Sequence, residues 1–534
     1  MSSYWDKSIT VTRFGNIPYR MYENRPRRID SLLSFAHNWI NRSHIIQGER
    51  IVTFAGLLHG SAEKGRVLID AGVSCGDHVV LLGWNSPDWV INFWACLRVG
   101  AIPVLANAWW SDAELAQALD LLQPRLVLAD RHGAGKLAPK SRWSIGPWDA
   151  NEKSDAVSLP PNPSVSLSEH DPAVIIFTSG TQGRAKAVVL PHRTFLANQQ
   201  MLLHVTRRLP YKPDPATGDI GLHTGPLFHI GGVHALIRAV LVGNTLVFGK
   251  GRFEPGEALE LIERHRIVRW AAVPTMATRL LEHPEVHRRD ISSLTAMTLG
   301  GAPVHPELLR RIRTTVPSVQ ARIATGYGLS ENGGQATTAS GKETSDLAGT
   351  TGRPMPLVEL KTISVPGLPD GEILIRSPTQ MLRYYGSDES PIDLEGWLHT
   401  GDLGKQNVDG YLWITGRCKD LIIRGGENIA PAAVEQAIAA IPGVTEAAVF
   451  GVPHADLGEE VMAVVVVEDD LSASQIEQQV RKGLASFAVP SLWHIQKEPL
   501  PVNQTGKIDK TRLRRHHLAL RSSAESAASE FARP

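Results

Sequence analysis

The sequence predicts a mixed α/β protein with a large N-terminal domain of mainly parallel α/β subdomains, a small β-rich subdomain, and a small α+β domain at the C-terminus. Three observations lead to this prediction: the length of the chain, an alternation of strand-like and helix-like segments, and a change of pattern after about residue 350. The chain has 534 residues. This is more than one hydrophobic core usually serves, so two or more domains are expected.

The alternation begins at about residue 79 and its last segment ends at residue 326. Residues 79–84 and 101–107 are apolar runs typical of buried strands, and residues 87–99 between them have helical spacing. Ser111 and Glu114 form a capping box ahead of a further helix. The alternation returns in the segments 245–248, 254–266, 270–274, 296–301, 306–316 and 321–326. Alternation of this kind predicts mainly parallel sheets covered by helices.

The later part of the chain has a different pattern. Short glycine-punctuated strands, such as residues 371–375, follow residue 350, and a compact α+β pattern begins near residue 420. A Pro- and Ser-rich stretch at 158–164 predicts a linker between two subdomains. We therefore expect the following divisions: a large domain at 1–418, with its β-rich part at about 345–418, a small domain at 419–515, and a flexible tail at 516–534.

Composition excludes several classes of protein. The 55 Lys and Arg residues nearly balance the 54 Asp and Glu residues, so no broad basic surface for nucleic acid is expected. Cys75, Cys96 and Cys418 lack the spacing of a disulfide framework or a metal site. No apolar run approaches the roughly 20 residues that span a bilayer, and no signal peptide is visible. We expect a cytoplasmic protein without stable membrane insertion, and leave open whether it is a homodimer.

A glycine-rich stretch, FTSGTQGRAK at 177–186, lies between two apolar runs. Glycine exposes backbone N–H groups that can surround phosphate oxygens, and the hydroxyls and Lys186 add donors and charge. The Walker pattern does not fit, because Gly180 and Gly183 are three residues apart and a strand follows rather than a helix. The stretch predicts a polyphosphate-binding loop, with a solvated hairpin turn as the alternative.

Four later stretches carry polar residues suited to a nucleotide. Residues 326–331, GYGLSE, offer an aromatic ring, a hydroxyl and a carboxylate that suit a base, a phosphate and Mg²⁺ respectively. Residues 396–402 end in an acid that can accept both ribose hydroxyls. Residues 416–420 and 501–507 add charged side chains. In isolation, residues 326–331 are equally consistent with an ordinary strand-end turn. For the other three stretches, an ordinary turn, a solvated linker and a surface lysine respectively are the favoured interpretations.

Together and in this order, these stretches resemble the adenylate-forming superfamily of acyl-CoA synthetases, nonribosomal-peptide adenylation domains and firefly-type luciferases. The resemblance runs from about residue 30 to residue 515 and includes the motifs at 226–229, 300–303 and 425–429. It implies that a carboxylate attacks the α-phosphorus of ATP and releases pyrophosphate, after which a thiol displaces AMP to form a thioester. Mg²⁺ and coenzyme A are therefore the expected cofactor and co-substrate.

The resemblance also assigns roles to individual residues. The residues that would hold the phosphates of ATP are Thr178, Ser179, Gly180, Thr181, Gly183 and Lys186. The residues that would flank adenine are Gly301, Ala302 and Tyr327, with Gly328 in the same motif. The remaining assignments are Ser330 to the α-phosphate, Glu331 to Mg²⁺, and Asp402 and Arg417 to the ribose hydroxyls.

A second group of assignments concerns the small domain. Lys507 would bridge the substrate carboxylate and the developing negative oxygen during adenylation. The small domain would then rotate about a hinge at Lys419 and bring Gly425 and Gly426 to the site, where they leave room for the pantetheine arm. His229 matches an aromatic gate that opens for the thiol, and a simply packed histidine is the alternative.

The acid is less constrained by the sequence. Residues 230–234, 300–304 and 332–334 carry no fixed charge for an amino acid's ammonium group, and their glycines, Gly231, Gly232, Gly333 and Gly334, suggest space for a long or bulky apolar acid. Residues 107–111 resemble bacterial fatty-acyl-CoA synthetases. We expect a medium- or long-chain fatty acid, with an aromatic or alicyclic acid as the alternative.

The acceptor of the acyl group and two alternative classes of function remain to be considered. Free coenzyme A is the simplest acceptor, and a separate carrier protein is the alternative. A non-catalytic nucleotide- or acyl-binding homologue would be marked by loss of Lys507, Glu331 or Asp402, and all three are present. A kinase or motor-type ATPase is disfavoured by the spacing in the glycine-rich loop.

Overall fold

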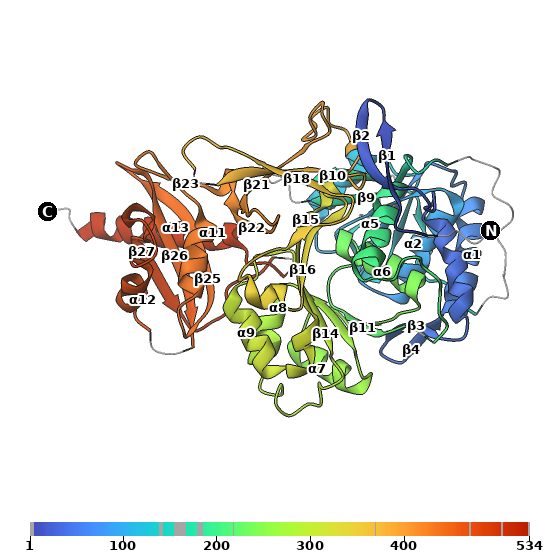
Figure 1. The fold of residues 1–534 in the computed structure, drawn as a ribbon, viewed down its shortest axis with the longest axis horizontal. Helices are drawn as coiled ribbons and strands as arrows, with labels where there is room; N and C mark the ends of the chain where they lie inside the picture. Colours follow the sequence, from blue (N-terminus) through green and yellow to red (C-terminus); the bar gives the residue numbers. More distant parts are fainter. Residues whose placement is uncertain are drawn as a thin grey trace.

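The computed structural model describes residues 5–137, 143–153, 167–178, 185–216, 218–368, 370–468, 471–503 and 506–531, with side chains as far as residue 520. The predicted linker at 158–164 lies outside these residues. Figure 1 shows a large domain, coloured from blue to yellow, with the orange and red C-terminal domain at its left. The prediction of a mixed α/β fold with a large N-terminal and a small C-terminal domain is confirmed.

Two large sheets form the centre of the N-terminal domain. The seven-stranded sheet has the order β20 (Arg383–Tyr384), β10 (Lys186–Pro191), β9 (Pro172–Thr178), β6 (Ile102–Leu105), β5 (His78–Leu82), β7 (Leu126–Ala129) and β8 (Ile145–Gly146). The nine-stranded sheet has the order β17 (Arg353–Pro354), β16 (Gly334–Ser340), β15 (Ile323–Leu329), β14 (Ala296–Leu299), β13 (Arg269–Ala272), β11 (Ile220–His223), β12 (Thr245–Phe248), β3 (Ser43–Gln47) and β4 (Arg50–Thr53).

The predicted parallel pairing is confirmed in the middle of both sheets. In the first sheet the strands from β9 to β8 are parallel to their neighbours, and in the second those from β15 to β3 are. Antiparallel pairs lie toward the edges, where β9 meets β10, β10 meets β20, β15 meets β16, β16 meets β17 and β3 meets β4. The hairpin of β9 and β10 carries the glycine-rich stretch.

Helices with clear end signals surround these sheets. They are the 3₁₀ segment η1 (Asp30–Trp39) and the helices α1 (Phe54–Asp70), α2 (Pro87–Val99), α3 (Asp112–Leu122), α4 (Arg131–Lys136), α5 (His192–Val205), α6 (Ile230–Val242), α7 (Pro255–Arg264), α8 (Pro274–Glu282), α9 (Pro306–Thr315) and α10 (Glu343–Asp346). The helix expected at 87–99 has those bounds, and Gly100 ends it in the left-handed conformation. The capping box of Ser111 and Glu114 is also confirmed.

Smaller sheets complete the N-terminal part. An antiparallel hairpin joins β1 (Ile9–Phe14) to β2 (Ile17–Tyr22), and a four-stranded antiparallel sheet has the order β18 (Glu359–Ile363), β19 (Gly371–Arg376), β21 (Leu398–Gln406) and β22 (Leu412–Arg417). Within the part expected to be one β-rich subdomain, β17 and β20 return to the two large sheets. This return brings Tyr384 next to β10, which matters for the site.

The C-terminal domain is built on a five-stranded sheet. Its path is β24 (Glu427–Ile429), β23 (Ile422–Arg424), β26 (Gly458–Val467) and β25 (Val444–His454), and β27 (Leu492–Gln496) pairs with β26 in parallel. The helices are α11 (Pro431–Ala439), α12 (Ala473–Val480) and α13 (Lys510–Phe531). Residues 516–531, expected as a flexible tail, are therefore helical, and their flexibility stays a prediction.

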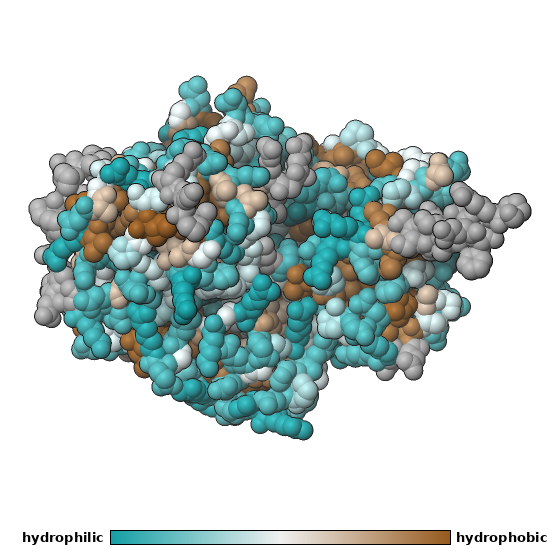
Figure 2. Space-filling model, turned by 180° about the vertical axis from the view of Figure 1, so that it is seen from behind, coloured by the Kyte–Doolittle hydropathy of each residue, from teal (hydrophilic) through white to brown (hydrophobic). Residues whose placement is uncertain are grey.

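The surface and the helices show no sign of a membrane-spanning segment in the described part of the chain. Figure 2 shows a largely hydrophilic face on which hydrophobic residues lie in scattered patches rather than in one band. None of the described helices is long and apolar enough to cross a bilayer.

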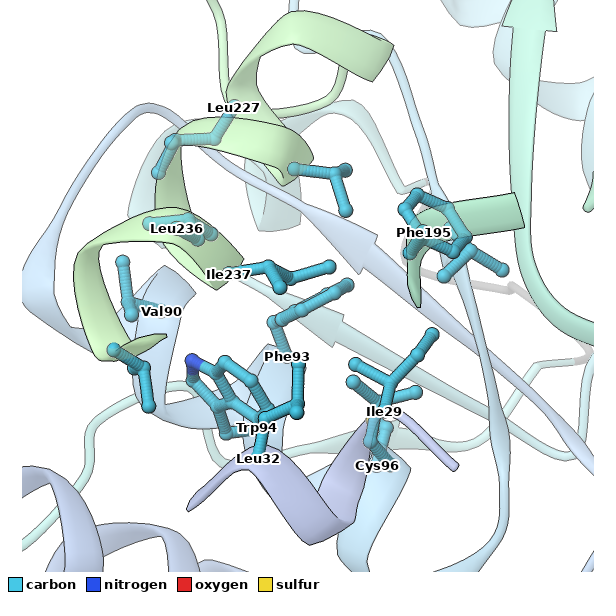
Figure 3. Packing of buried hydrophobic residues seen from close by; sticks show 14 of the residues in the cluster. Ile29, Leu32, Val90, Phe93, Trp94, Cys96, Phe195, Leu227, Leu236 and Ile237 are labelled. Carbon is cyan, nitrogen blue, oxygen red and sulfur yellow. The ribbon is translucent and has the colours of Figure 1, made fainter. Parts of the chain in front are cut away.

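The largest hydrophobic core fixes the start of α6, next to which the site lies. Figure 3 shows Phe93 and Trp94 of α2 packed between Leu236 and Ile237 of α6 on one side and Leu32 of η1 on the other. All five side chains are buried. Close packing of these large side chains against α6 holds this helix in place, and with it the loop that carries His229.

Candidate active site

The glycine-rich stretch connects two strands that pair in an antiparallel hairpin. Thr178, at the end of β9, lies opposite Lys186, at the start of β10. Ser179, Gly180, Thr181 and Gly183 lie outside the described residues, so their predicted contacts with phosphate stay predictions. A hairpin was the alternative interpretation, and its topology is present. It does not conflict with phosphate binding, because the pairing of β9 with β10 places Thr178 opposite Lys186, and Thr178 contacts Glu331.

Glu331 lies in η3 (Ser330–Asn332), directly after β15, where the chain turns back into β16. Its Oε1 accepts a hydrogen bond of 3.0 Å from the Tyr384 hydroxyl and a longer one of 3.4 Å from Thr178 Oγ1. Among the described residues, none donates to Oε2. The carboxylate is thus held by one oxygen and presents the other.

The neighbouring motif residues shape the backbone around Glu331. Ser330 precedes it and is half-buried, as is Tyr327. A Cβ added to Gly328 would lie 1.8 Å from the Gly334 carbonyl oxygen, so β15 and β16 approach too closely there for any side chain. Gly328 is therefore needed for backbone packing, which is a separate requirement from the nucleotide contact predicted for its motif.

Asp402 is the centre of a second hydrogen-bonded group, formed where β21 pairs with β22. Arg417 Nε donates to Asp402 Oδ1 at 2.9 Å, and the Tyr327 hydroxyl donates to Oδ2 at 2.7 Å. Asp402 is only 6% exposed. Burial, followed by the Asp402 charge, raises the pKa of Tyr327 well above its usual value, so the phenol remains a hydrogen-bond donor. The structure thus brings the three predicted nucleotide residues together.

Lys507 reaches this group from the C-terminal domain. A Cβ added to Gly301, which has a φ of +78°, would lie 3.6 Å from Lys507 Cε and 4.0 Å from Lys507 Nζ. The half-buried Ala302 follows Gly301. Burial, then the charge of Arg417, lowers the pKa of Lys507, while Asp402 acts in the opposite direction. The lysine therefore lies within electrostatic reach of the Asp402 group, and its role in the adenylation step stays a prediction.

Backbone and side-chain contacts between the domains hold Lys507 there. The Thr275 hydroxyl of α8 donates to the Gly506 carbonyl oxygen, and Arg279 Nη2 donates to the Leu500 carbonyl oxygen at 3.1 Å. Arg311 of α9 lies 3.5 Å from the Glu468 carboxylate of the small domain. These contacts place the small domain against α8 and α9, as Figure 1 shows.

His229 precedes α6 and its ring lies 4.9 Å from that of Phe228. Its Nε2 is buried and has no hydrogen-bond partner among the described residues. Burial, then the Lys507 charge, lowers the pKa of His229 to about 4, so the ring is neutral at pH 7. The structure therefore places His229 near Lys507, and its predicted gating role is untested.

The residues assigned to the second step are not at the site in this arrangement. Lys419 is exposed in the short 3₁₀ turn η4 (Cys418–Asp420), between β22 of the N-terminal part and β23 of the C-terminal sheet. Gly425 and Gly426 form the two-residue turn of the β23–β24 hairpin, with φ of +59° and +89°. Within the described part of the chain, the nearest contact of Gly425 is with Leu457 of its own domain.

The argument that four glycines leave space for the acid is wrong for three of them. A Cβ on Gly232 would lie 2.6 Å from the Leu227 backbone, one on Gly333 would lie 2.2 Å from Thr194 Cγ2, and one on Gly334 would lie 2.8 Å from His234 Nε2. At these three positions, neighbouring atoms already occupy the space that a side chain would need. Only Gly231 of the four has nothing within 4 Å of an added Cβ among the described residues.

The sequence did not single out Tyr384, whose hydroxyl bonds to Glu331. It placed His234 only within the expected acyl-binding segment 230–234, and the structure brings His234 Nε2 to 2.7 Å from the Gly333 carbonyl oxygen. Tyr384 belongs to none of the motifs described above. Tyr384 reaches the site through the return of β20 to the large sheet, which no local pattern in the sequence reveals.

Two protein-family models match the chain, one in the N-terminal domain and one in the C-terminal domain. Residues 34–385 match the AMP-binding enzyme family, and residues 433–507 match the C-terminal domain of AMP-binding enzymes. The first match alone covers more than half of the chain.

Two curated relatives cover most of the chain. A feruloyl-CoA synthase from Amycolatopsis sp is 31% identical over 478 residues, 88% of this chain and 94% of the relative. The 3-[(3aS,4S,7aS)-7a-methyl-1,5-dioxo-octahydro-1H-inden-4-yl]propanoyl:CoA ligase of Mycobacterium tuberculosis is 33% identical over 495 residues, 88% of this chain and 95% of the relative.

Solved structures agree with this result. The O-succinylbenzoate coenzyme A synthetase of Bacillus subtilis, in complex with ATP and magnesium ion, has a TM-score of 0.73 and 27% identity, and the match covers 91% of this chain and 98% of that one. A fatty acyl CoA synthetase of Mycobacterium tuberculosis has a TM-score of 0.70 and 26% identity, with coverage of 92% and 99%. The chain belongs to the AMP-binding enzyme family and is an ATP-dependent acid–CoA ligase of the adenylate-forming superfamily.

Proposed function

We propose that this enzyme activates a compact, ring-bearing carboxylic acid as its acyl-adenylate and transfers the acyl group to free coenzyme A. The observation that carries the reaction assignment is the convergence of Lys507 with the Asp402 group beside Gly301. In this arrangement the Lys507 ammonium group lies near Asp402 and Arg417, and Glu331 presents a free carboxylate oxygen beside Thr178 and Tyr384.

The first step is supported by charge placement. A carboxylate oxygen of the acid attacks the α-phosphorus of ATP, and the bond to the pyrophosphate oxygen breaks. Lys507 neutralises charge on the acid and on the phosphoryl oxygen as the reacting atoms approach. Asp402 and Arg417 fix the ribose, and Thr178 and Lys186 mark where the pyrophosphate part binds.

Magnesium fits this site as a partner of ATP rather than as an ion held in a protein cage. Among the described residues, no group of three or more metal-ligating side chains occurs. Mg²⁺ commonly binds through one or two carboxylates together with substrate phosphates and water, and the free Oε2 of Glu331 can supply one such ligand. When bound, the ion would neutralise phosphate charge.

The second step requires a different arrangement of the domains. Only η4 and its flanking residues link β22 to β23, so rotation at Lys419 can move the small domain without disturbing either sheet. Rotation would withdraw Lys507 and bring in the exposed Gly425–Gly426 turn. The thiol sulfur then attacks the acyl carbon, and AMP leaves with the bonding electrons.

The choice of a ring-bearing acid over a fatty acid rests on two points. The glycines that suggested room for a long or bulky acid are mostly packed against neighbouring atoms, which favours a compact acid, and both curated relatives described above are named for acids that contain rings. A fatty acid is the second candidate, favoured by the likeness to the mycobacterial fatty acyl CoA synthetase. Cytoplasmic location and a homodimer stay predictions.

A panel of acids tests this proposal. Purified enzyme with MgATP is supplied with ferulate, benzoate, a bicyclic propanoate, octanoate or palmitate, each with and without coenzyme A, and AMP, pyrophosphate and thioester are measured. We expect AMP and thioester together for a ring-bearing acid. Preference for palmitate would transfer the assignment to fatty acids, and pyrophosphate exchange without thioester would favour a carrier-protein acceptor. ADP formation would contradict the mechanism.

A further inference from the structure

Tyr384 contacts both Glu331 and Lys186, the residue at the C-terminal end of the glycine-rich stretch. It lies opposite Val188 in the pairing of β20 with β10, while Lys186 lies opposite Thr178 in the pairing of β10 with β9. Lys186 and Val188 are two residues apart and share a face of β10, so Tyr384 is the diagonal neighbour of Lys186. Accordingly, Lys186 Nζ lies 4.7 Å from the centre of the Tyr384 ring.

The Tyr384 hydroxyl donates its hydrogen bond to the Glu331 carboxylate. It donates to Glu331 Oε1 at 3.0 Å, and Tyr384 is only 7% exposed. A neutral phenol that donates to a carboxylate forms a charge-assisted hydrogen bond, which is stronger than a bond between neutral groups.

The second donor to the same oxygen is weaker. Thr178 Oγ1 lies 3.4 Å from Glu331 Oε1, at the long end of hydrogen-bond distances. Since both donors contact Oε1, they fix the rotation of the carboxylate and leave Oε2 available. The ring of Tyr384 meanwhile faces Lys186, whose ammonium group also lies 3.4 Å from Glu389 Oε2.

We propose that Tyr384 is a positioning residue that orients the Glu331 carboxylate toward Mg²⁺ and couples it, through its ring, to the phosphate-binding Lys186. This inference rests on the proposed magnesium role of Glu331. The hydroxyl sets the carboxylate, and the ring limits the directions open to the lysine. One tyrosine therefore aligns a cation-binding oxygen and an anion-binding nitrogen before MgATP arrives.

The chain offers a matched control in the next residue. Tyr385 packs its ring 5.0 Å from that of His78 and lies against the cluster under α3. Tyr385→Phe removes the same atom as Tyr384→Phe from an adjacent position that has no contact with Glu331. A second variant, Thr178→Val, removes the weaker donor to the same oxygen.

The test compares these variants as free Mg²⁺ is titrated. The readouts are acid-dependent pyrophosphate exchange, calorimetric affinity for Mg²⁺ with a non-hydrolysable ATP analogue, and melting temperature. We expect Tyr384→Phe to raise the Mg²⁺ concentration for half-maximal exchange by roughly tenfold, the factor for about 1.4 kcal/mol, to weaken analogue binding, and to recover its rate at saturating Mg²⁺. Thr178→Val should change Mg²⁺ dependence in the same direction by less, and Tyr385→Phe should match wild type.

Two results would overturn the proposal. One is an unchanged Mg²⁺ dependence and analogue affinity in Tyr384→Phe. The other is a loss of rate that is the same at every Mg²⁺ concentration and is accompanied by a lower melting temperature, because that pattern indicates a structural role only. If Tyr384→Phe does not fold, an unchanged Mg²⁺ dependence in Thr178→Val overturns it. Absence of exchange in wild type would instead refute the proposed function.

Discussion

The two halves of the active site are held in different ways. On the large-domain side, the Asp402 and Glu331 carboxylates each accept hydrogen bonds from two side chains that come from sheets or their ends. On the small-domain side, Lys507 lies on a loop, and its residue is fixed by hydrogen bonds with Asn503. Within the described part of the chain, Lys507 forms no ion pair. The half proposed to bind nucleotide is held by side-chain hydrogen bonds within the large domain, while the Lys507 side chain proposed to bring the reactive charge is held only through backbone and interdomain contacts of its loop.

This difference suits a reaction with two steps. When the side chains of a nucleotide site are already aligned in the free enzyme, little free energy is lost to their reorganisation as the nucleotide binds. A lysine without a fixed partner can serve the first step and then withdraw with its domain. We therefore expect changes on the large-domain side to affect nucleotide binding in both steps, and changes at Lys507 to affect the first step alone.

The largest expected effect is that of Lys507→Ala. Loss of one preorganised charge in a site that excludes water typically costs about 10²–10³-fold in rate, and we expect a decrease of that size in acid-dependent pyrophosphate exchange. Lys482→Ala, at an exposed lysine of the same domain, is the control. Exchange at the wild-type rate in Lys507→Ala would show that the lysine has no part in adenylation.

Asp402→Asn should have the next largest effect, because it removes the charge that pairs with Arg417 and accepts from Tyr327. A hydrogen bond to a charged group contributes about 1.5–3 kcal/mol, so we expect KM for ATP to rise by roughly 10- to 100-fold. Asp409→Asn, in an exposed turn of the same sheet, should leave KM unchanged. An unaltered KM for ATP in Asp402→Asn would exclude a ribose-binding role.

The pH dependence of the first step distinguishes the two halves further. The active form of Lys507 carries a proton, and burial lowers its pKa from the usual value of 10.5. The adenylation rate should therefore fall with rising pH at a lower pH than an ordinary lysine would give. Lys507→Arg should move this decline to higher pH, since arginine keeps its charge. His229, with a pKa of about 4, should cause no change between pH 5 and pH 8.

The smallest expected effect concerns the contact between the domains. Arg311 lies 3.5 Å from Glu468, which is 56% exposed, and such surface pairs contribute at most about 1 kcal/mol. Arg311→Ala should therefore slow pyrophosphate exchange by no more than roughly fivefold. The control is Arg310→Ala, since Arg310 pairs with Glu307 of its own helix. Equal effects of the two changes would show that the contact does not stabilise the adenylation arrangement.

The sequence predicted correctly those structural features that depend on residues close to one another along the chain. The helix at 87–99 and the capping box of Ser111 and Glu114 follow from side chains within one or two turns, and the structure confirms both. The parallel sheets follow from the alternation of segments, which the structure also confirms. The resemblance to the adenylate-forming superfamily is confirmed as well.

The sequence was a poor guide where a residue's role depends on a distant neighbour. Gly231 and Gly232 are adjacent, yet one is open and the other is packed against the Leu227 backbone. Tyr384 and Tyr385 differ in the same way, since one bonds to Glu331 and the other packs against His78. In both pairs the difference arises from chain segments far away in sequence, so neither spacing nor composition could reveal it.

The most direct test of the account separates the two steps in one variant. Lys507→Ala is given a synthetic acyl-adenylate and coenzyme A, and thioester formation is followed in a single turnover beside the wild-type enzyme. The account predicts that the variant forms the thioester at close to the wild-type rate although its adenylation has nearly stopped. An equal loss in both steps would contradict the central claim that Lys507 acts in the first step and leaves the site before the second.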